Sequence, residues 1–245
     1  MHLQGNVAIV TGGSRGIGRA IAERLASDGA YVVVNYAGNR GKAEETVQAI
    51  VQAGGKAVAI QADVSGVREV ERLFSETAEK LGRVDILINN AGIMETQPIG
   101  EVKEADFDKH FAINVKGTYF ACQQAAKHMK PGGRIVNLST SVVGGMFPGY
   151  SVYAATKGAV EQITRQLAKE LGPKGITINA IAPGPVATEL FTAGKTEEQI
   201  EALSRLNAFQ RLGRPEDIAG AVAMLVHRQS QWITGQTVRA NGGYV

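Results

Sequence analysis

The sequence predicts an α/β fold in which one doubly wound parallel sheet carries helices on both faces. Three observations predict it. Short apolar runs, several rich in β-branched residues, recur along the chain as expected for strands buried on both faces. Amphipathic segments separate these runs, and glycines stand where several of those segments should end as helices. Regular alternation of strand and helix is the pattern of a parallel sheet.

The elements follow in order along the chain. The expected strands are the apolar runs 7–10, 31–34, 57–60, 86–88, 135–138, 177–181 and 237–238. Helical spacing is clearest where Ile17, Ile21 and Leu25 step by four, and again from Val160 to Leu171. Helix ends are expected at Gly29, Gly54, Gly82 and Gly172.

Length and composition limit the function. A chain of 245 residues is typical of a single α/β domain, so we expect one domain over 1–245. The alternation lapses at about 185–212, and a long irregular stretch of this kind is typical of a substrate-binding loop. The net charge of +3 comes without a run of Lys or Arg, so no nucleic-acid partner is expected. Cys122 is the single cysteine, and no signal peptide or membrane span is evident, which favours a cytoplasmic protein.

A glycine-rich turn follows the first expected strand. Gly12, Gly16 and Gly18 form G-x-x-x-G-x-G, with Ser14, Arg15 and Ile17 between them. Glycines let backbone N–H groups approach a pyrophosphate, and the helix that begins near Gly16 points its positive end at the phosphate charge. No Gly-Lys-Ser/Thr follows, which excludes a P-loop. The turn predicts a Rossmann-type dinucleotide site.

The end of the second strand favours NADP(H) over NAD(H). NAD-binding folds usually place an acid here to bind the ribose hydroxyls, whereas this chain has Asn35, Tyr36 and Ala37. Arg15 and Arg40 are available to pair with a 2′-phosphate. For Arg40, a solvated surface position is an equally good interpretation, so Arg15 is the stronger candidate.

Tyr153 and Lys157 stand at i and i+4, which places a phenol and an ammonium on the same face of a helix. Lowering the pKa of a tyrosine by about three units requires about 4 kcal/mol. A cation near 4 Å supplies about that much at an effective dielectric constant near 20. We therefore expect Lys157 to lower the pKa of Tyr153.

Together with Asn89-Asn90-Ala91-Gly92, Asn114 and Pro183-Gly184, these motifs resemble the short-chain dehydrogenase/reductase family, in order and spacing and over essentially the whole chain. The chain is most similar to the 3-oxoacyl-carrier-protein reductase-like and the tri/tetrahydroxynaphthalene reductase-like members. The ending Ala240-Asn241-Gly242-Gly243-Tyr244-Val245 resembles the latter.

The resemblance implies a catalytic set. Tyr153 would be the general acid, and Lys157 would also hold the ribose of the cofactor. Asn114 would lie at a local break in its helix and hold a water that passes protons to Lys157. A hydroxyl residue would orient the carbonyl: the usual spacing from Tyr153 and from Gly133 selects Thr140, while local pattern favours Ser141 and a longer spacing favours Ser139.

Further cofactor contacts are implied by the resemblance at Asp63, Val64, Asn90, Ala91, Gly92, Pro183, Gly184, Val186 and Thr188. With these, the expected cofactor-binding residues are Gly12, Ser14, Arg15, Gly16, Ile17, Gly18, Asn35, Tyr36, Ala37, Asp63, Val64, Asn90, Ala91, Gly92, Ser139, Tyr153, Lys157, Pro183, Gly184, Val186 and Thr188. The scattered histidines have no partners at metal-ligand spacing, so no metal site is expected.

The leading hypothesis is an NADPH-dependent oxidoreductase that reduces a small-molecule carbonyl substrate to an alcohol. One alternative is a sugar or polyol dehydrogenase that works in the oxidative direction. Another is a catalytically silent NADPH-binding sensor or structural subunit, against which the intact Tyr153 and Lys157 argue. Relatives commonly form homotetramers, so we expect one here. The mixed face of Ala159, Gln162, Gln166 and Glu170 is a candidate for one two-fold contact, and the C-terminal strand near 235–245 is a candidate for a second.

Overall fold

A computed structural model describes residues 2–245 and contains a seven-stranded parallel sheet of order β3-β2-β1-β4-β5-β6-β7. All neighbouring strands run parallel. The strands are β1 (Val7–Val10), β2 (Tyr31–Tyr36), β3 (Lys56–Gln61), β4 (Ile86–Asn89), β5 (Arg134–Leu138), β6 (Thr177–Pro183) and β7 (Thr237–Ala240).

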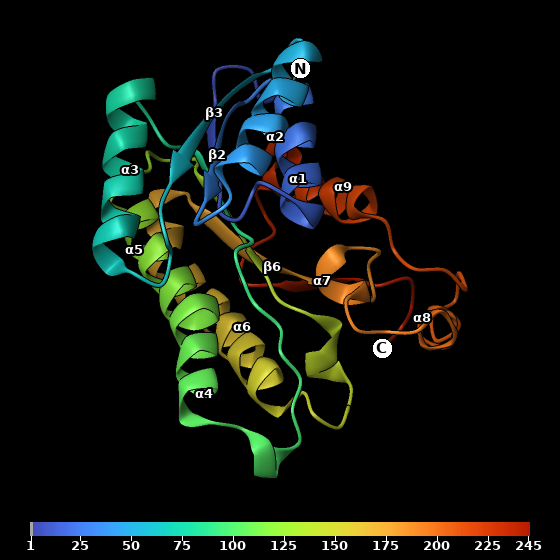
Figure 1. Cartoon of the computed structure of the whole chain (residues 1–245). Coiled ribbons are helices and arrows are strands. Elements are labelled where there is room, and N and C mark those ends of the chain that lie inside the picture. Colours follow the sequence, from blue (N-terminus) through green and yellow to red (C-terminus); the bar gives the residue numbers. More distant parts are fainter. Residues whose placement is uncertain (1) are drawn as a thin grey trace.

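Helices cover both faces of the sheet, as Figure 1 shows. The α-helices are α1 (Gly16–Ser27), α2 (Arg40–Gln52), α3 (Val67–Leu81), α4 (Glu104–His110), α5 (Thr118–His128), α6 (Ser151–Leu171), α7 (Glu189–Thr192), α8 (Glu197–Ser204) and α9 (Pro215–Val226). The shorter helical segments are η1 (Ile99–Glu101), the π-helical η2 (Phe111–Gly117), η3 (Ser141–Gly144), η4 (Gly172–Lys174) and η5 (Arg228–Ser230).

Two apolar cores lie on opposite faces of the sheet. Helices α1, α2 and α9 contribute to one core, and α3, α5 and α6 contribute to the other. The central strand β1 supplies both, because Ala8 and Val10 belong to the first core while Val7 and Ile9 belong to the second. Successive side chains of a strand point to opposite faces, so a strand buried on both must be apolar throughout. This explains why β1 reads as an unbroken apolar run.

The strand order places a natural binding crevice in the middle of the sheet. From β1 the sheet grows through β2 to β3 on one side and through β4 to β7 on the other. The connections leaving β1 and β4 therefore diverge at the carboxyl ends of these strands, and a crevice opens between them. The glycine turn follows β1 and Asn90 follows β4, so both lie at this crevice.

The predicted fold class and each expected strand are confirmed, with strand ends that differ. Several strands extend into residues that are not aliphatic, namely Asn35 and Tyr36 in β2 and Asn89 in β4. Gly29, Gly54 and Gly82 have positive φ just after their helices, as expected. Gly172 does not: its φ is −52°, and a short turn carries the chain on to Gly175 at φ 68°.

The stretch 185–212 is more regular than its sequence suggested, because two short helices form within it. The Thr188 side chain caps α7 by accepting a hydrogen bond from Phe191 N. Thr196 and Gln199 form a reciprocal capping box at the start of α8. In Figure 1, α7 and α8 lie on the side of the molecule where the C-terminus ends. Among residues 2–245, no helix is both long and apolar enough to cross a membrane.

Candidate active site

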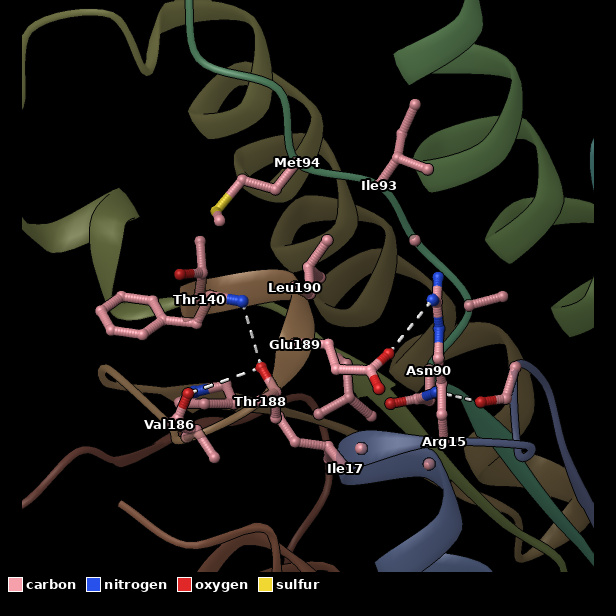
Figure 2. A pocket seen from close by; sticks show the side chains of 18 of the residues that line it. Arg15, Ile17, Asn90, Ile93, Met94, Thr140, Val186, Thr188, Glu189 and Leu190 are labelled. Atoms are coloured by element: carbon pink, nitrogen blue, oxygen red, sulfur yellow. Dashed lines mark hydrogen bonds and ion pairs between the residues drawn. The ribbon is translucent and has the colours of Figure 1, made fainter. Parts of the chain in front are cut away.

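A cavity of about 880 Å³ opens at the carboxyl ends of the central strands, with the glycine turn on one side and α7 on the other (Figure 2). Nearly every residue predicted for the site lines it. These are Gly12, Ser14, Arg15, Gly16, Ile17, Gly18, Asn35, Tyr36, Ala37, Asp63, Val64, Asn90, Ala91, Gly92, Ser139, Thr140, Tyr153, Lys157, Pro183, Gly184, Val186 and Thr188. Asn114 is the exception and lies behind the cavity wall.

The glycine turn has the shape that a pyrophosphate requires. Gly12 and Gly16 have φ values of 62° and 53°, which side chains disfavour. A Cβ on Gly18 would lie 2.3 Å from the Gly12 carbonyl oxygen, so only glycine fits. Helix α1 then begins without a side-chain cap and without an acid in its first turn. Its first N–H groups are therefore free for an anion, and the turn fits a dinucleotide phosphate.

Two asparagines hold the turn in place. The Asn35 side chain accepts a hydrogen bond from Gly12 N (3.3 Å) and donates one to Ala62 O (3.0 Å). The Asn90 side chain donates to Thr11 O (2.9 Å) and Gly12 O (3.1 Å). Their side-chain amides are thus engaged in shaping the cradle for the cofactor.

The cations beside the turn are paired with a carboxylate. Arg15 Nη1 lies 3.7 Å from Glu189 Oε2, and Lys42 Nζ lies 3.2 Å from Glu189 Oε1. Figure 2 shows Glu189 reaching from the start of α7 toward Arg15. The end of β2 carries no acid, as expected, but in the free protein this carboxylate from α7 meets both cations. Glu189 comes from a segment distant in sequence, so the end of β2 alone did not reveal it.

Lys42 is a cavity-lining cation that the sequence reasoning missed. It lies in the first turn of α2, and its backbone N–H is capped by the Asn39 side chain at 3.0 Å. An Asn cap directly after the second strand was the available signal. Arg40 instead pairs with Glu44 at 2.6 Å on the exposed side of α2, as its surface interpretation predicted.

Helix α6 brings Tyr153 and Lys157 onto the cavity wall. The Lys157 side chain is buried, and its Nζ donates a hydrogen bond to Leu138 O at 2.7 Å. Nζ also lies 5.9 Å from the centre of the Tyr153 ring. The i, i+4 spacing therefore places the two groups together, as expected.

The expected lowering of the Tyr153 pKa is wrong for the free protein. Burial raises the pKa of Tyr153 to about 12, and hydrogen bonding to the Thr140 side chain opposes this only in part. Burial also lowers the pKa of Lys157 to about 8. Removal from water disfavours both charged forms, and Lys157 is not among the groups that shift the pKa of Tyr153. Tyr153 is consequently a neutral phenol at pH 7.

The structure distinguishes the three candidate hydroxyls by their partners. Ser139 Oγ donates to Glu161 Oε1 at 2.7 Å. Ser141 Oγ donates to Ala182 O at 3.1 Å and accepts from the Asn241 side chain. Thr140 is the one whose side chain acts on the Tyr153 phenol. Among these three hydroxyls, that of Thr140 is the one that lowers the pKa of Tyr153.

Asn114 occupies a break in helical geometry, as expected. It lies in η2, where a π-helical turn separates α4 from α5. Its side chain accepts from Ile93 N (2.9 Å) and donates to Ile93 O (3.0 Å) and Thr156 Oγ1 (3.1 Å). Asn114 therefore ties the segment after β4 to α6, one residue away from Lys157.

The remaining predicted residues line the cavity from two segments, one after β3 and one after β6. Asp63 is exposed and accepts from Ser65 N, while Val64 is buried. Gly184 follows β6 and packs so closely on Asn241 that a Cβ would lie 2.9 Å from its Cβ. Val186 pairs with Gly213 in an isolated bridge, which anchors the start of the stretch that carries Thr188.

An aromatic wall near Tyr153 was not predicted. The rings of Tyr150 and Tyr153 lie 6.5 Å apart, and Phe147 lies 5.9 Å from both Tyr150 and Tyr244. All four rings line the cavity. Tyr244 joins this wall from the other end of the chain, so only the fold brings the set together.

Comparisons with known proteins agree with this geometry. A family model described as Enoyl-(Acyl carrier protein) reductase matches residues 12–245. The hydroxynaphthalene reductase-like protein Arp2 of Metarhizium guizhouense is 44% identical over 257 residues, covering 99% of this chain and 96% of the relative. A short chain dehydrogenase from Burkholderia cenocepacia in complex with NADP has a TM-score of 0.95 and 38% identity, covering 100% of this chain and 99% of that one. The angucycline C-6 ketoreductase LanV with bound NADP has a TM-score of 0.94 and 39% identity, covering 99% and 96%.

One family assignment accounts for the glycine turn, for the pairing of Tyr153 with Lys157 and for these full-length similarities. The family model covers nearly the whole chain. The relatives also cover it almost completely, and identities of 38% and 44% indicate a shared family as well as a shared fold. The chain belongs to the short-chain dehydrogenase/reductase family and is an oxidoreductase that uses NADP(H).

Proposed function

We propose that the protein reduces a ketone to an alcohol with NADPH, and that Tyr153 is the proton donor. The observation that carries this proposal is the arrangement of Tyr153, Thr140 and Lys157 on one wall of the cavity. A phenol whose pKa burial raises to about 12 is protonated at neutral pH. A protonated phenol can give a proton to a carbonyl oxygen, whereas alcohol oxidation would require the phenolate. The reductase and ketoreductase names of the relatives favour reduction over the polyol dehydrogenase alternative.

Each residue has a distinct role in this proposal. NADPH, when bound at the glycine turn, would supply the hydride for the carbonyl carbon. The Thr140 hydroxyl donates a hydrogen bond to the carbonyl oxygen and orients it, and Tyr153 transfers its proton to the same oxygen. Lys157, held by Leu138 O, binds the cofactor ribose and places a positive charge beside the developing phenolate. Asn114 fixes α6 from behind through Thr156.

The substrate is proposed to be a ketone with an apolar or aromatic body. Phe147, Tyr150 and Tyr244 offer ring faces beside Tyr153, and aromatic surfaces favour aromatic ligands. The proposed substrate-binding loop at 185–212, within a single domain over 1–245, adds Leu190, Phe191 and Leu203 to the cavity lining. The reductase and ketoreductase names of the relatives support this substrate class.

The test compares the three hydroxyl residues on a panel of aromatic and aliphatic ketones, scored by NADPH consumption. Thr140→Ala should lower turnover by about 100-fold, the scale for losing a group that acts in proton transfer. Ser141→Ala is the matched control, because its hydroxyl is bonded to Ala182 O and Asn241 instead. Greater loss in Ser141→Ala, or in Ser139→Ala, would refute the assignment of Thr140.

A homotetramer remains our proposal for the assembly. Gln162, Gln166 and Glu170 form an exposed face of α6, as expected for a helix available to a second copy. Within residues 2–245 the edge strand β7 pairs with β6 alone, and Trp232 nearby is 96% exposed. Unpaired edges and large exposed aromatics favour burial in an assembly. Light scattering at dilute concentration tests it, and a mass near 25.9 kDa would exclude it.

A further inference from the structure

One carboxylate bridges the two sides of the cavity mouth. Glu189 is the first residue of α7, and it pairs with Lys42 of α2 through both oxygens, at 3.2 and 3.3 Å. Its Oε2 also lies 3.7 Å from Nη1 of Arg15 in the glycine turn. All three residues line the cavity. A single anion thus links the glycine turn to α7 across the mouth of the cavity, as the dashed contact in Figure 2 shows for Arg15.

The position between Arg15 and Lys42 is suited to a phosphate group. Two cations from separate elements converge there, next to the open N-terminal turn of α1. The end of β2, with Asn35, Tyr36 and Ala37, adds no acid to it. Four other charged residues line the cavity, namely Arg19, Lys157, Glu45 and Asp63, and Arg19 is paired with Glu23 at 2.7 Å.

The Glu189 contacts are of a kind that a phosphate can displace. The Glu189 and Arg15 side chains are 69% and 65% exposed, and exposed ion pairs contribute little. A phosphate dianion carries more charge and more acceptor oxygens than a carboxylate, and it pairs strongly with Arg. The two anions repel each other when they share the same cations. Arg15 and Lys42 therefore cannot hold both anions at full strength.

We propose that Glu189 is a built-in competitor for the 2′-phosphate of NADP(H). In the free protein it pairs with both Arg15 and Lys42 at the mouth of the cavity. The 2′-phosphate displaces it from these two cations. Lys42 is accordingly a second determinant of the preference for NADP(H) over NAD(H), beside Arg15.

The experiment measures dissociation constants for NADPH and NADH by nicotinamide fluorescence, without substrate. Glu189→Gln removes the competing charge at an exposed position where folding is not at risk. NADPH binding should tighten about two- to fivefold, the range for breaking exposed ion pairs, while NADH binding changes less than 1.5-fold. The NADPH effect should vanish at about 1 M salt. Lys42→Gln should weaken NADPH binding and remove most of the benefit of Glu189→Gln in the double variant.

Three results would overturn the proposal. Weaker or unchanged NADPH binding by Glu189→Gln would mean that the carboxylate closes over the cofactor or does not act on it. Equal tightening of NADPH and NADH would place the effect at the pyrophosphate instead of the 2′-phosphate. The control Glu79→Gln makes the same change of net charge at an exposed residue of α3 outside the cavity. An equal effect of this control would assign the gain to net charge alone. The readout is cofactor binding, so its outcome does not depend on ketone reduction.

Discussion

The buried ammonium of Lys157 should make the protein less stable at neutral pH than at alkaline pH. Burial lowers the pKa of Lys157 from 10.5 to about 8, so below pH 8 the folded state bears a charge that it accommodates poorly. A shift of this size corresponds to a cost of about 3 kcal/mol, fully present below pH 8. The cost is relieved as pH rises from about 8 toward 10.5, because the folded state has lost its proton while the unfolded state still holds one.

Lys157→Met removes this cost and keeps a long unbranched side chain. It also leaves Leu138 O without its donor, which costs about 1–3 kcal/mol at any pH. The two effects partly cancel at pH 7, so the expected net change there is small. Only the cost of burying the Lys157 charge depends on pH, so the stabilities of wild type and variant still change differently as pH rises. Between pH 7 and pH 9.5 wild type should gain about 2 kcal/mol of stability relative to the variant, from the linkage of these two pKa values.

Urea unfolding of the cofactor-free protein at both pH values measures this difference, at one protein concentration. The comparison with the variant removes the contributions of titrating groups that are distant from Lys157. Lys169→Met is the matched control on the exposed side of α6 and should follow wild type at both pH values. Parallel pH dependence of wild type and Lys157→Met would refute the reasoning, since it would mean that Lys157 is not destabilised by burial.

Three further predictions concern single side chains. Gly18→Ala places a Cβ 2.3 Å from Gly12 O, so the dissociation constant of this variant for NADPH should rise at least about tenfold. Unchanged affinity in a fluorescence titration would contradict the close packing of the turn. Ala37→Asp puts a carboxylate at the end of β2 and should weaken NADPH binding about tenfold without changing NADH binding. Equal weakening of NADPH and NADH binding in the same titration would count against a 2′-phosphate position there. Burial raises the pKa of Cys122 to about 12, so iodoacetamide at pH 8 should label it only in urea; rapid labelling of the native protein, seen by mass spectrometry, would show that the thiol is accessible.

The fold was predictable because its strands carry a strong local signal. In β1, both faces are buried, so every residue had to be apolar and the run was unmistakable. Strand ends were less predictable where the last residues are polar and hydrogen-bond to the glycine turn. Asn35 continues β2 because its amide holds Gly12 and Ala62, a requirement that no local pattern expresses.

Site residues within one motif were predictable, and contacts between motifs were not. The spacing of Tyr153 and Lys157 fixed their common helix face in advance. The pKa of Tyr153 depends on how much water the assembled cavity removes, which spacing cannot express. The bridge from Lys42 to Glu189 spans 147 positions and exists only once α7 lies beside α2.

The most direct test of the central claim is the turnover of Tyr153→Phe with the ketone that wild type reduces fastest. This variant keeps the ring and removes only the proton that Tyr153 is proposed to donate. NADPH should bind with an affinity within about twofold of wild type, and turnover should fall by at least about 100-fold. Near-normal turnover with normal NADPH binding would contradict the account, because the carbonyl oxygen would then receive its proton from another group.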